Sequence, residues 1–383
     1  MLEIASDNLV FNFPEVHPDA KLTISLIRTL RIPDDNKRYA LPPGLGTFPV
    51  RHVDDFKNRV PSKWVKHGGV LIPMYQSEAM WLSFRCSHSS LRQAAYPFAI
   101  KVATGKRSAL TGGPWSKSLK DKDYMVAPTQ PWLDGYVIAD GVIRQFVAAP
   151  LGQGFTAEEQ ITGKAEFGGL QIEVMPMKRN CFERRYPERP ASHRITRSRK
   201  FQTLVMSDLK FGSSGLYSEG LISDHDSLDV DYARGLDTVT VNCCAESQAL
   251  TEISEMGLAP GGTMNQQIFA DSFGISEWDT DSKNRCFIHL VNSMTWRAIT
   301  DEAPPTVPFT AADYTRHGYA WFDYYRDDLK VLKGTSTLKG LKSVAKMGKK
   351  KGINILPENT SVIPKHIIKL GKHHGVVRDG VWK

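Results

Sequence analysis

The sequence has no long hydrophobic run and no export signal. Residues 1–7 include neither the basic segment nor the apolar segment that begins a secretory signal. The most apolar stretch, 68–84, is interrupted by Pro73, Gln76 and Glu78, whereas a membrane span needs about 20 apolar residues in succession. We therefore expect no transmembrane span, and we expect two strands around a polar turn in this stretch.

Cysteine is also scarce, with five in 383 residues, an odd number without C-x-x-C spacing. This pattern excludes a disulfide framework and a zinc ribbon, and it favours a reducing, cytoplasmic compartment. The nucleophile pattern G-x-S-x-G and the zinc pattern H-E-x-x-H are missing as well. We therefore expect a protein without a metal or cofactor, and the sequence favours a function other than catalysis.

Positive charge is concentrated at the C-terminal end. The net charge is +8, yet residues 326–383 hold 14 Lys and Arg against 4 Asp and Glu, an excess of +10. A smaller basic cluster, 184–200, contains Pro187 and Pro190, which predict an exposed loop rather than a helix. The remainder of the chain is close to neutral, so the excess positive charge of the protein lies in the tail.

The basic tail has the pattern of an amphipathic helix beginning at Leu338. At 100° per residue, apolar and basic side chains separate onto opposite halves. The apolar half holds Leu338, Leu341, Val344, Ala345 and Met347, and the basic half holds Lys339, Lys342, Lys346, Lys349 and Lys350. Such a helix packs on its own body, contacts a neighbouring subunit, or binds an anionic surface such as a membrane periphery.

The rest of the chain predicts an α+β fold. Strands are expected at 22–32, 170–175 and 238–244, and Asp140-Gly141 predicts a type I′ hairpin turn within 136–146. Helical spacing is expected at 285–299, with Ser282 as its N-cap, and a second helix is expected after the capping residue Thr310.

These elements predict a β-rich, mostly antiparallel N-terminal body with helices gathered in the C-terminal third. The expected division is a β-rich body at 1–245, a helical region at 246–330 packed on that body, and a basic C-terminal arm at 331–383. A very short hairpin at 376–383, with Asp379-Gly380 as its turn, is expected to pair with a neighbouring subunit.

A glycine-rich segment suggests an alternative function. Gly152, Gly154 and Thr156 belong to a G-x-G-x-x-A pattern between an expected strand and an expected helix, where backbone amides can bind phosphate. Glu173 lies where a ribose-binding acid belongs in a dinucleotide fold. The expected helix, 156–161, is short for a parallel crossover. A simple turn before a surface helix is the competing interpretation.

Two weaker patterns also bear on chemistry. Asp224, Asp226, Asp229, Asp231 and Asp237 form an acidic cluster that fails the EF-hand pattern, so a solvated loop facing the basic cluster 184–200 is expected rather than a metal site. Cys286 and His289 lie three residues apart on an expected helix, a spacing compatible with a thiolate–imidazole pair.

Several segments resemble a known family. These are 130–135 (QPWLDG), 143–147 (IRQFV), 285–289 (RCFIH) followed by 296–300 (WRAIT), and 321–325 (WFDYY). They are similar to a family of uncharacterised bacterial and fungal proteins often labelled "integral membrane protein". The resemblance covers most of the chain and implies no activity.

Together these features predict a non-enzymatic structural or interaction protein that self-associates. Its basic arm would contact an anionic partner or a neighbouring subunit. The alternative is an enzyme or binding protein for a phosphate-containing or nucleotide ligand at residues 152–157. Nucleic-acid binding is not expected, because no RNP, zinc-finger or helix-turn-helix pattern accompanies the charge.

Overall fold

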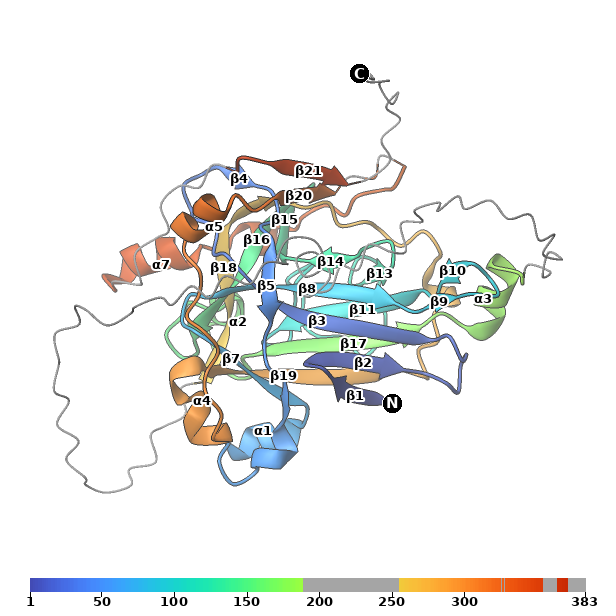
Figure 1. Ribbon diagram of the computed structural model, residues 1–383, viewed down its shortest axis with the longest axis horizontal. Coiled ribbons are helices and arrows are strands. Elements are labelled where there is room, and N and C mark those ends of the chain that lie inside the picture. The colour runs from blue at the N-terminus through green and yellow to red at the C-terminus, as the bar shows by residue number, and fades with distance from the viewer. Residues whose placement is uncertain (189–254, 325, 327, 354–363, 371–383) are drawn as a thin grey trace, which may run out of the picture.

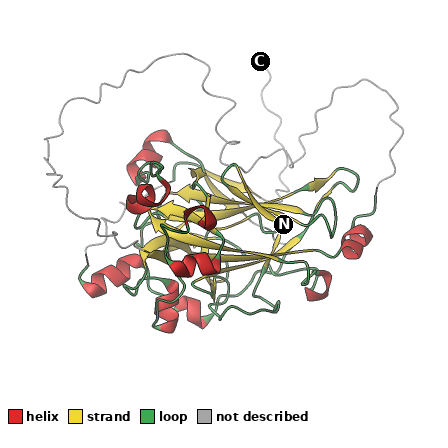
Figure 2. Cartoon of the chain, turned by 90° about the horizontal axis from the view of Figure 1, so that it is seen from below, coloured by secondary structure: helices red, strands yellow, loops and turns green. Residues whose placement is uncertain are grey.

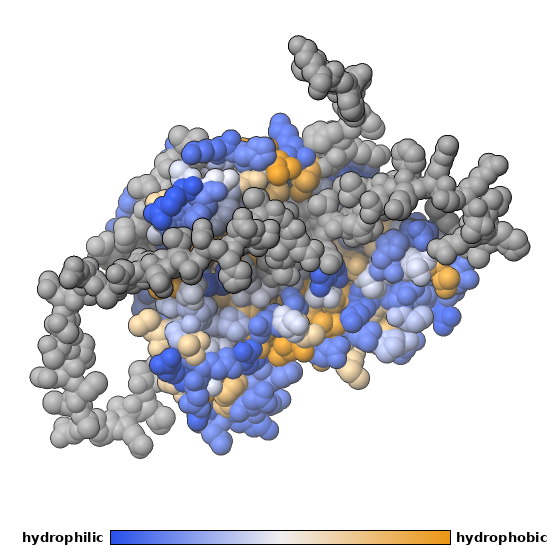
Figure 3. All heavy atoms as spheres, viewed as in Figure 1, coloured by the Kyte–Doolittle hydropathy of each residue, from blue (hydrophilic) through white to orange (hydrophobic). Residues whose placement is uncertain are grey.

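The computed structural model describes residues 1–188, 255–324, 326, 328–353 and 364–370. It is 38% strand and 18% helix, which confirms the α+β class with a β-rich body. One large sheet of 17 strands runs through the molecule, and the helices lie around its periphery (Figures 1 and 2). Hydrophilic residues cover most of the described surface on the side shown in Figure 3, with small apolar patches between them.

The strands of the large sheet come from most of the described chain. They are β1 (Leu2–Ala5), β2 (Asn8–Asn12), β3 (Lys21–Thr29), β4 (Arg38–Tyr39), β5 (Gly44–Thr47), β6 (Arg51–His52), β7 (Val70–Met74), β8 (Ala79–Cys86), β11 (Phe98–Thr104), β12 (Arg107–Ser108), β13 (Met125–Ala127), β14 (Trp132–Leu133), β15 (Gly135–Ala139), β16 (Val142–Pro150), β17 (Leu170–Pro176), β18 (Glu255–Asn265) and β19 (Asn284–Asn292). Two small sheets pair β9 (His88–Ser89) with β10 (Ala94–Ala95), and β20 (Trp321–Tyr324) with β21 (Ile367–Leu370).

The long strands pair in the order β1–β2–β3–β8–β16–β18–β19–β17–β11–β13, antiparallel throughout. Only the attachments of β7 to β19, β4 to β18 and β21 to β20 are parallel among the described pairings. Strands such as β11 and β17 are buried along their whole length, as expected of strands covered on both faces.

The helices are short. They are α1 (Ser62–His67), α2 (Ala157–Thr162), α3 (Arg179–Arg185), α4 (Ser293–Thr300), α5 (Ala311–His317), α6 (Ser336–Lys339) and α7 (Val344–Lys351), with 3-10 turns η1 (Val53–Phe56) and η3 (Ile275–Glu277). Helices α1 and α4 cover one end of β7 and β19 through a small apolar cluster that includes Trp64, Val291 and Trp296. Helix α5 begins with the predicted capping box at Thr310.

Several local predictions are confirmed. Strands β3 and β17 occupy two of the expected strand segments, and residues 68–84 form β7 and β8 around a polar turn. The hairpin of β15 and β16 is also present, but its predicted turn type is wrong. Of its two turn residues only Gly141 has a positive φ, +64°, whereas a type I′ turn needs two.

The prediction of one helix over 285–299 is wrong. Residues 284–292 form β19, and only the following residues form a helix, α4, whose N-cap is Asn292 rather than Ser282. Strand β19 pairs with β17 on one side and with β7 on the other. These pairings override the local helical spacing. The expected helical region 246–330 therefore contains two strands from the interior of the sheet, β18 and β19.

Candidate functional site

In the described part of the C-terminal arm, residues 336–351 form two short helices rather than the single helix predicted from Leu338. Helix α6 ends at Gly340, and Ser343 caps a new helix, α7, by accepting a hydrogen bond from the Lys346 amide at 3.2 Å. The Ser343 hydroxyl also bonds the carboxylate of Asp34. This contact fixes the start of α7 on the body, because the Asp34 side chain is only 4% exposed.

The apolar side of the arm packs on its own body. Leu338, Leu341 and Val344 are buried, with 0%, 5% and 3% of their surface exposed. Val344 and the partly buried Met347 join a cluster with Phe155 and neighbouring residues of β8, β16 and β18. Residues 336–351 of the arm are thus a fixed part of the described fold.

The basic side of the arm faces outward. We call Lys339, Lys342, Lys346, Lys349 and Lys350 the lysine face; all five are exposed. Lys346 lies 3.7 Å from a carboxylate oxygen of Asp34. The other four have no acidic partner within the described ranges. Charges of one sign held together on a fixed scaffold create a local positive potential that attracts anionic groups.

Backbone amides of the glycine-rich segment are hydrogen-bonded to a side chain of the protein itself. Glu159, on α2, accepts hydrogen bonds from the Gly154 amide at 2.7 Å, the Thr156 amide at 3.1 Å and the Thr156 hydroxyl at 2.7 Å. Thr156 in turn caps α2. Gly152 and Gly154 have φ values of +91° and +73°, so both positions favour glycine for its backbone freedom. A carboxylate therefore occupies two of the amides that a bound phosphate would need.

Glu173 is also engaged within the sheet. It pairs across strands with Lys101 of β11 and Arg285 of β19, and its oxygens lie 3.7 Å and 3.9 Å from their nitrogens. Burial raises the pKa of the Glu173 carboxyl, and Lys101 opposes that shift. Lys101 is only 2% exposed and also lies 3.5 Å from Asp123. This cluster neutralises charge between strands and leaves Glu173 in a structural role.

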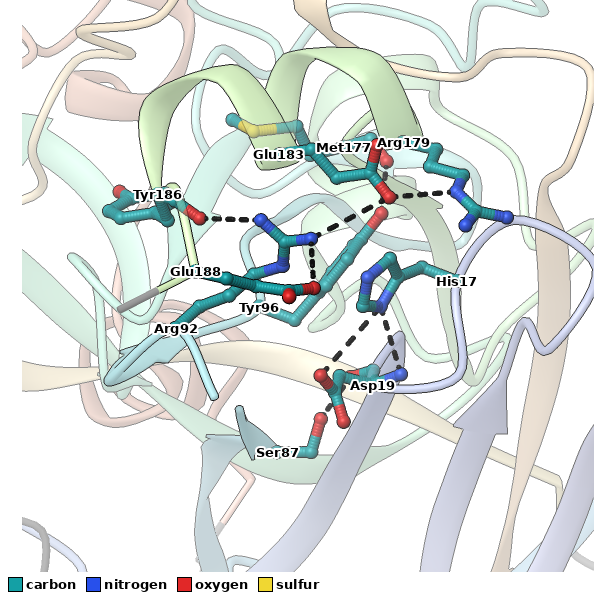
Figure 4. A network of polar contacts seen from close by, with 10 residues as sticks. All are labelled: His17, Asp19, Ser87, Arg92, Tyr96, Met177, Arg179, Glu183, Tyr186 and Glu188. Atoms are coloured by element: carbon teal, nitrogen blue, oxygen red, sulfur yellow. Dashed lines mark hydrogen bonds and ion pairs between the residues drawn. The ribbon is translucent and has the colours of Figure 1, made fainter. Parts of the chain in front are cut away.

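A second polar region, which the sequence analysis missed, surrounds α3 (Figure 4). Arg92, 10% exposed, donates to the Tyr186 carbonyl at 2.8 Å and to Glu188 at 2.9 Å, and it lies 3.8 Å from Glu183. Arg179 donates to Glu183 at 2.9 Å. These contacts join α3 to the β9–β10 hairpin, which contributes Arg92.

An open groove of about 540 Å³ lies beside this network. We call it the acidic groove. It is lined by Glu15, Val16, Lys178, Arg179, Asn180, Glu183, Asp279, Asp281 and Ser282. Its four carboxylates outnumber its two cationic side chains, and one of those cations, Arg179, is already bound to Glu183. No pattern in the sequence could have revealed this groove, because its residues come from three distant segments.

His17 lies next to the groove, between Asp19 and the side chains of α3 (Figure 4). Its Nδ1 accepts a hydrogen bond from the Asp19 amide at 3.0 Å. Burial lowers the pKa of His17, with Asp19 acting in the opposite direction. Because Nδ1 accepts the hydrogen bond from the Asp19 amide, the neutral form of the ring carries its proton on Nε2. The ring packs against Tyr96 and Phe182 with centroid distances of 5.2 Å and 5.1 Å.

Cys286 and His289 do not form a pair. Because both lie on β19, three residues apart, their side chains point to opposite faces of the sheet. Cys286 enters the main core, whereas His289 stacks on Trp64 at 4.6 Å and hydrogen-bonds the Gly68 carbonyl at 3.1 Å. Burial raises the pKa of the Cys286 thiol to about 12, so the thiolate needed for nucleophilic attack is disfavoured.

Other predicted features fall partly or wholly outside the described residues. The acidic cluster 224–237, the strand 238–244 and the hairpin 376–383 all lie outside them. Two residues of the basic cluster, Arg184 and Arg185, lie at the end of α3 rather than in a loop, and both bind Glu277. Among the described residues, no group of histidine, cysteine, aspartate or glutamate side chains is placed to hold a metal ion.

Within the described ranges, no helix is both long enough and apolar enough to cross a membrane. Comparisons with protein-family models, with curated proteins and with solved structures found no match for this chain.

Proposed function

We propose that this chain is a non-enzymatic structural or interaction protein of the cytoplasm that self-associates, and that its lysine face contacts an anionic partner or a neighbouring subunit. One observation carries the proposal. The arm buries its apolar side chains on the body, while four lysines of the lysine face stay exposed without an acidic partner in the described part of the chain.

The contact made by this face is electrostatic. The buried apolar side chains are not free to insert into a lipid layer, so the exposed ammonium groups supply the attraction. Exposed ion pairs are individually weak and are screened by salt. The three described cysteines, Cys86, Cys181 and Cys286, are free thiols, which fits a reducing compartment.

The alternative function at residues 152–157 receives less support. A phosphate at this loop would compete with the Glu159 carboxylate for the amides of Gly154 and Thr156, and it would be repelled by that carboxylate. The short helix α2 also lacks the length of a parallel crossover.

Sedimentation velocity of the full-length protein at low and high ionic strength tests the proposal. We expect assemblies at low salt, and we expect them to be lost when Lys339, Lys342, Lys349 and Lys350 are all changed to Gln. A matched control changes four exposed lysines elsewhere, Lys21, Lys57, Lys66 and Lys120, to Gln.

The two quadruple variants have the same net charge, so only the position of the charge differs. The control should assemble like the wild type. Equal loss of assembly in both variants would show that net charge alone matters. A wild-type protein that stays monomeric at low salt would refute self-association.

A further inference from the structure

Like the lysine face, the acidic groove contains charged side chains that form no ion pair with another described residue. Glu15, Asp279 and Asp281 line it, and none of the three forms an ion pair with another described residue. Asp279 is fixed in place because one of its oxygens accepts the amides of Asp281 at 3.1 Å and Ser282 at 3.0 Å. These carboxylates can therefore bind cationic side chains of another molecule.

His17 adds a second, independent polar group beside the groove. The residue is 5% exposed, its Nδ1 accepts the Asp19 amide, and its Nε2 makes no hydrogen bond to a residue that the structure describes. The ring faces Glu183 and Arg179, two side chains that line the groove (Figure 4). Nε2 is not one of the fully buried atoms without a partner, so it is open to solvent beside the groove and can donate to an incoming acceptor such as a backbone carbonyl.

The lysine face and the acidic groove cannot satisfy each other within one copy. Helix α7 lies at one end of the long axis of the molecule, and α3 lies at the opposite end (Figure 1). Helix α7, which carries Lys349 and Lys350, and helix α3, which borders the groove, therefore lie far apart in one copy. Contact between them requires two copies arranged head to tail.

We infer that the lysine face of one copy docks into the acidic groove of the next. This inference rests on the proposed function and names the anionic partner: a second copy of this chain. Because the two surfaces differ, the contact is heterologous, so each added copy leaves one face and one groove free. Assembly then continues beyond the dimer, into a ring or an open chain.

Both surfaces are already ordered in each copy before two copies associate. The Asp34–Ser343 contact and the buried apolar side chains fix α7, and the turn at Asp279 fixes the groove. The backbone of both surfaces is therefore ordered before docking, which reduces the entropy cost of association, although the lysine side chains still lose rotamer freedom. The attraction is still that of exposed charges, so we expect the association constant to fall about tenfold or more between low and high salt.

Two variants that each remove one surface provide the test. The face variant changes Lys339, Lys342, Lys349 and Lys350 to Gln. The groove variant is Glu15→Gln, Asp279→Asn and Asp281→Asn; at position 279 the side-chain amide oxygen of the substituted residue keeps the acceptor that the turn needs. Circular dichroism and thermal melting confirm that both variants are folded.

Sedimentation velocity at low salt then compares the wild type, each variant and their mixture. The wild type should form species larger than dimers, and each variant alone should be monomeric. The mixture should form one-to-one dimers and nothing larger, because the face variant keeps an intact groove and the groove variant keeps an intact face.

The other outcomes separate this inference from the proposed function. If the wild type assembles but the groove variant assembles equally well, self-association holds and the groove is not its site. If the wild type is monomeric but co-sediments with phosphatidylserine vesicles, and the face variant does not, the face binds lipid and the head-to-tail inference is overturned. A monomeric wild type that ignores such vesicles refutes both.

Discussion

Asp134 lies at the junction of β14 and β15 and is 1% exposed. Neither of its carboxylate oxygens makes a well-formed hydrogen bond in the described part of the chain, although Trp132 and Gln266 lie close enough to interact with the carboxyl. Burial raises the pKa of Asp134 well above its usual range, and Trp132 and Gln266 offset only part of that shift. A charge in such surroundings is strongly disfavoured, so the folded protein keeps this carboxyl protonated to a higher pH than the unfolded chain does.

The sign of the pH dependence follows from this shift. In the unfolded chain the carboxyl ionises near pH 4, but in the folded protein it keeps its proton to a higher pH. The folded state therefore loses stability as the pH rises from about 4 to the folded-state pKa, at about 1.4 kcal/mol per pH unit. Asp134→Asn has the same shape without an ionisable group, so its advantage over the wild type should grow at that rate.

Urea unfolding followed by tryptophan fluorescence at several pH values between 4 and 8 measures this difference. Asp140→Asn, in the exposed turn of the same hairpin, is the matched control and should show no growing advantage. A difference between Asp134→Asn and the wild type that stays constant with pH would refute the reasoning. So would a wild type more stable than the variant at neutral pH.

Three further substitutions should also change stability. Arg28→Met leaves the buried Glu78 without its partner, 2.7 Å away, and should destabilise the fold by about 3–5 kcal/mol in urea unfolding. Glu159→Ala removes three hydrogen bonds that hold the glycine-rich loop and should cost about 2 kcal/mol by the same assay. Burial lowers the pKa of His289 to about 3, so wild-type stability should fall as the pH drops below about 6.5, by up to ~1.4 kcal/mol per unit. His289→Phe should lack this part of the acid sensitivity when both proteins are unfolded across pH 4 to 7.

Exposed residues of the same types serve as controls: Arg38→Met, Glu166→Ala and His52→Phe. Each should change stability by less than about 0.5 kcal/mol. A loss in any control as large as in its buried counterpart would show that burial is not the cause. Equal acid sensitivity of His289→Phe and the wild type would contradict the assignment to this ring.

Local patterns predicted the elements whose signals were unambiguous. Strand β3 and the capping box of α5 follow from residues within one segment. Residues 285–299 were ambiguous because their apolar residues fit both the 3.6-residue period of a helix and the two-residue period of a strand. Cys286, Ile288 and Leu290 alternate into the core as a strand requires. Met294 follows Leu290 by four residues, the spacing of an apolar helix face, yet it is 78% exposed. Residues 284–292 form a strand because they pair with β17 and β7. A single sequence does not show which strands pair.

The candidate surfaces differ in the same way. The lysine face could be predicted because its five lysines lie within twelve consecutive positions. The acidic groove could not, because Glu15, Glu183 and Asp279 are far apart in the chain and only the fold brings them together. The orientation of the arm was likewise a tertiary result, fixed by the contact between Ser343 and Asp34.

The carboxylate of Glu159 changes how the glycine-rich motif of this chain is interpreted. A G-x-G-x-x-A segment is usually considered a phosphate cradle because its amides are free. Here Glu159, three residues after the capping Thr156, binds these amides with its own carboxylate. In this chain Glu159 supplies the anion that binds these amides, so the G-x-G-x-x-A spacing alone does not indicate a phosphate site here.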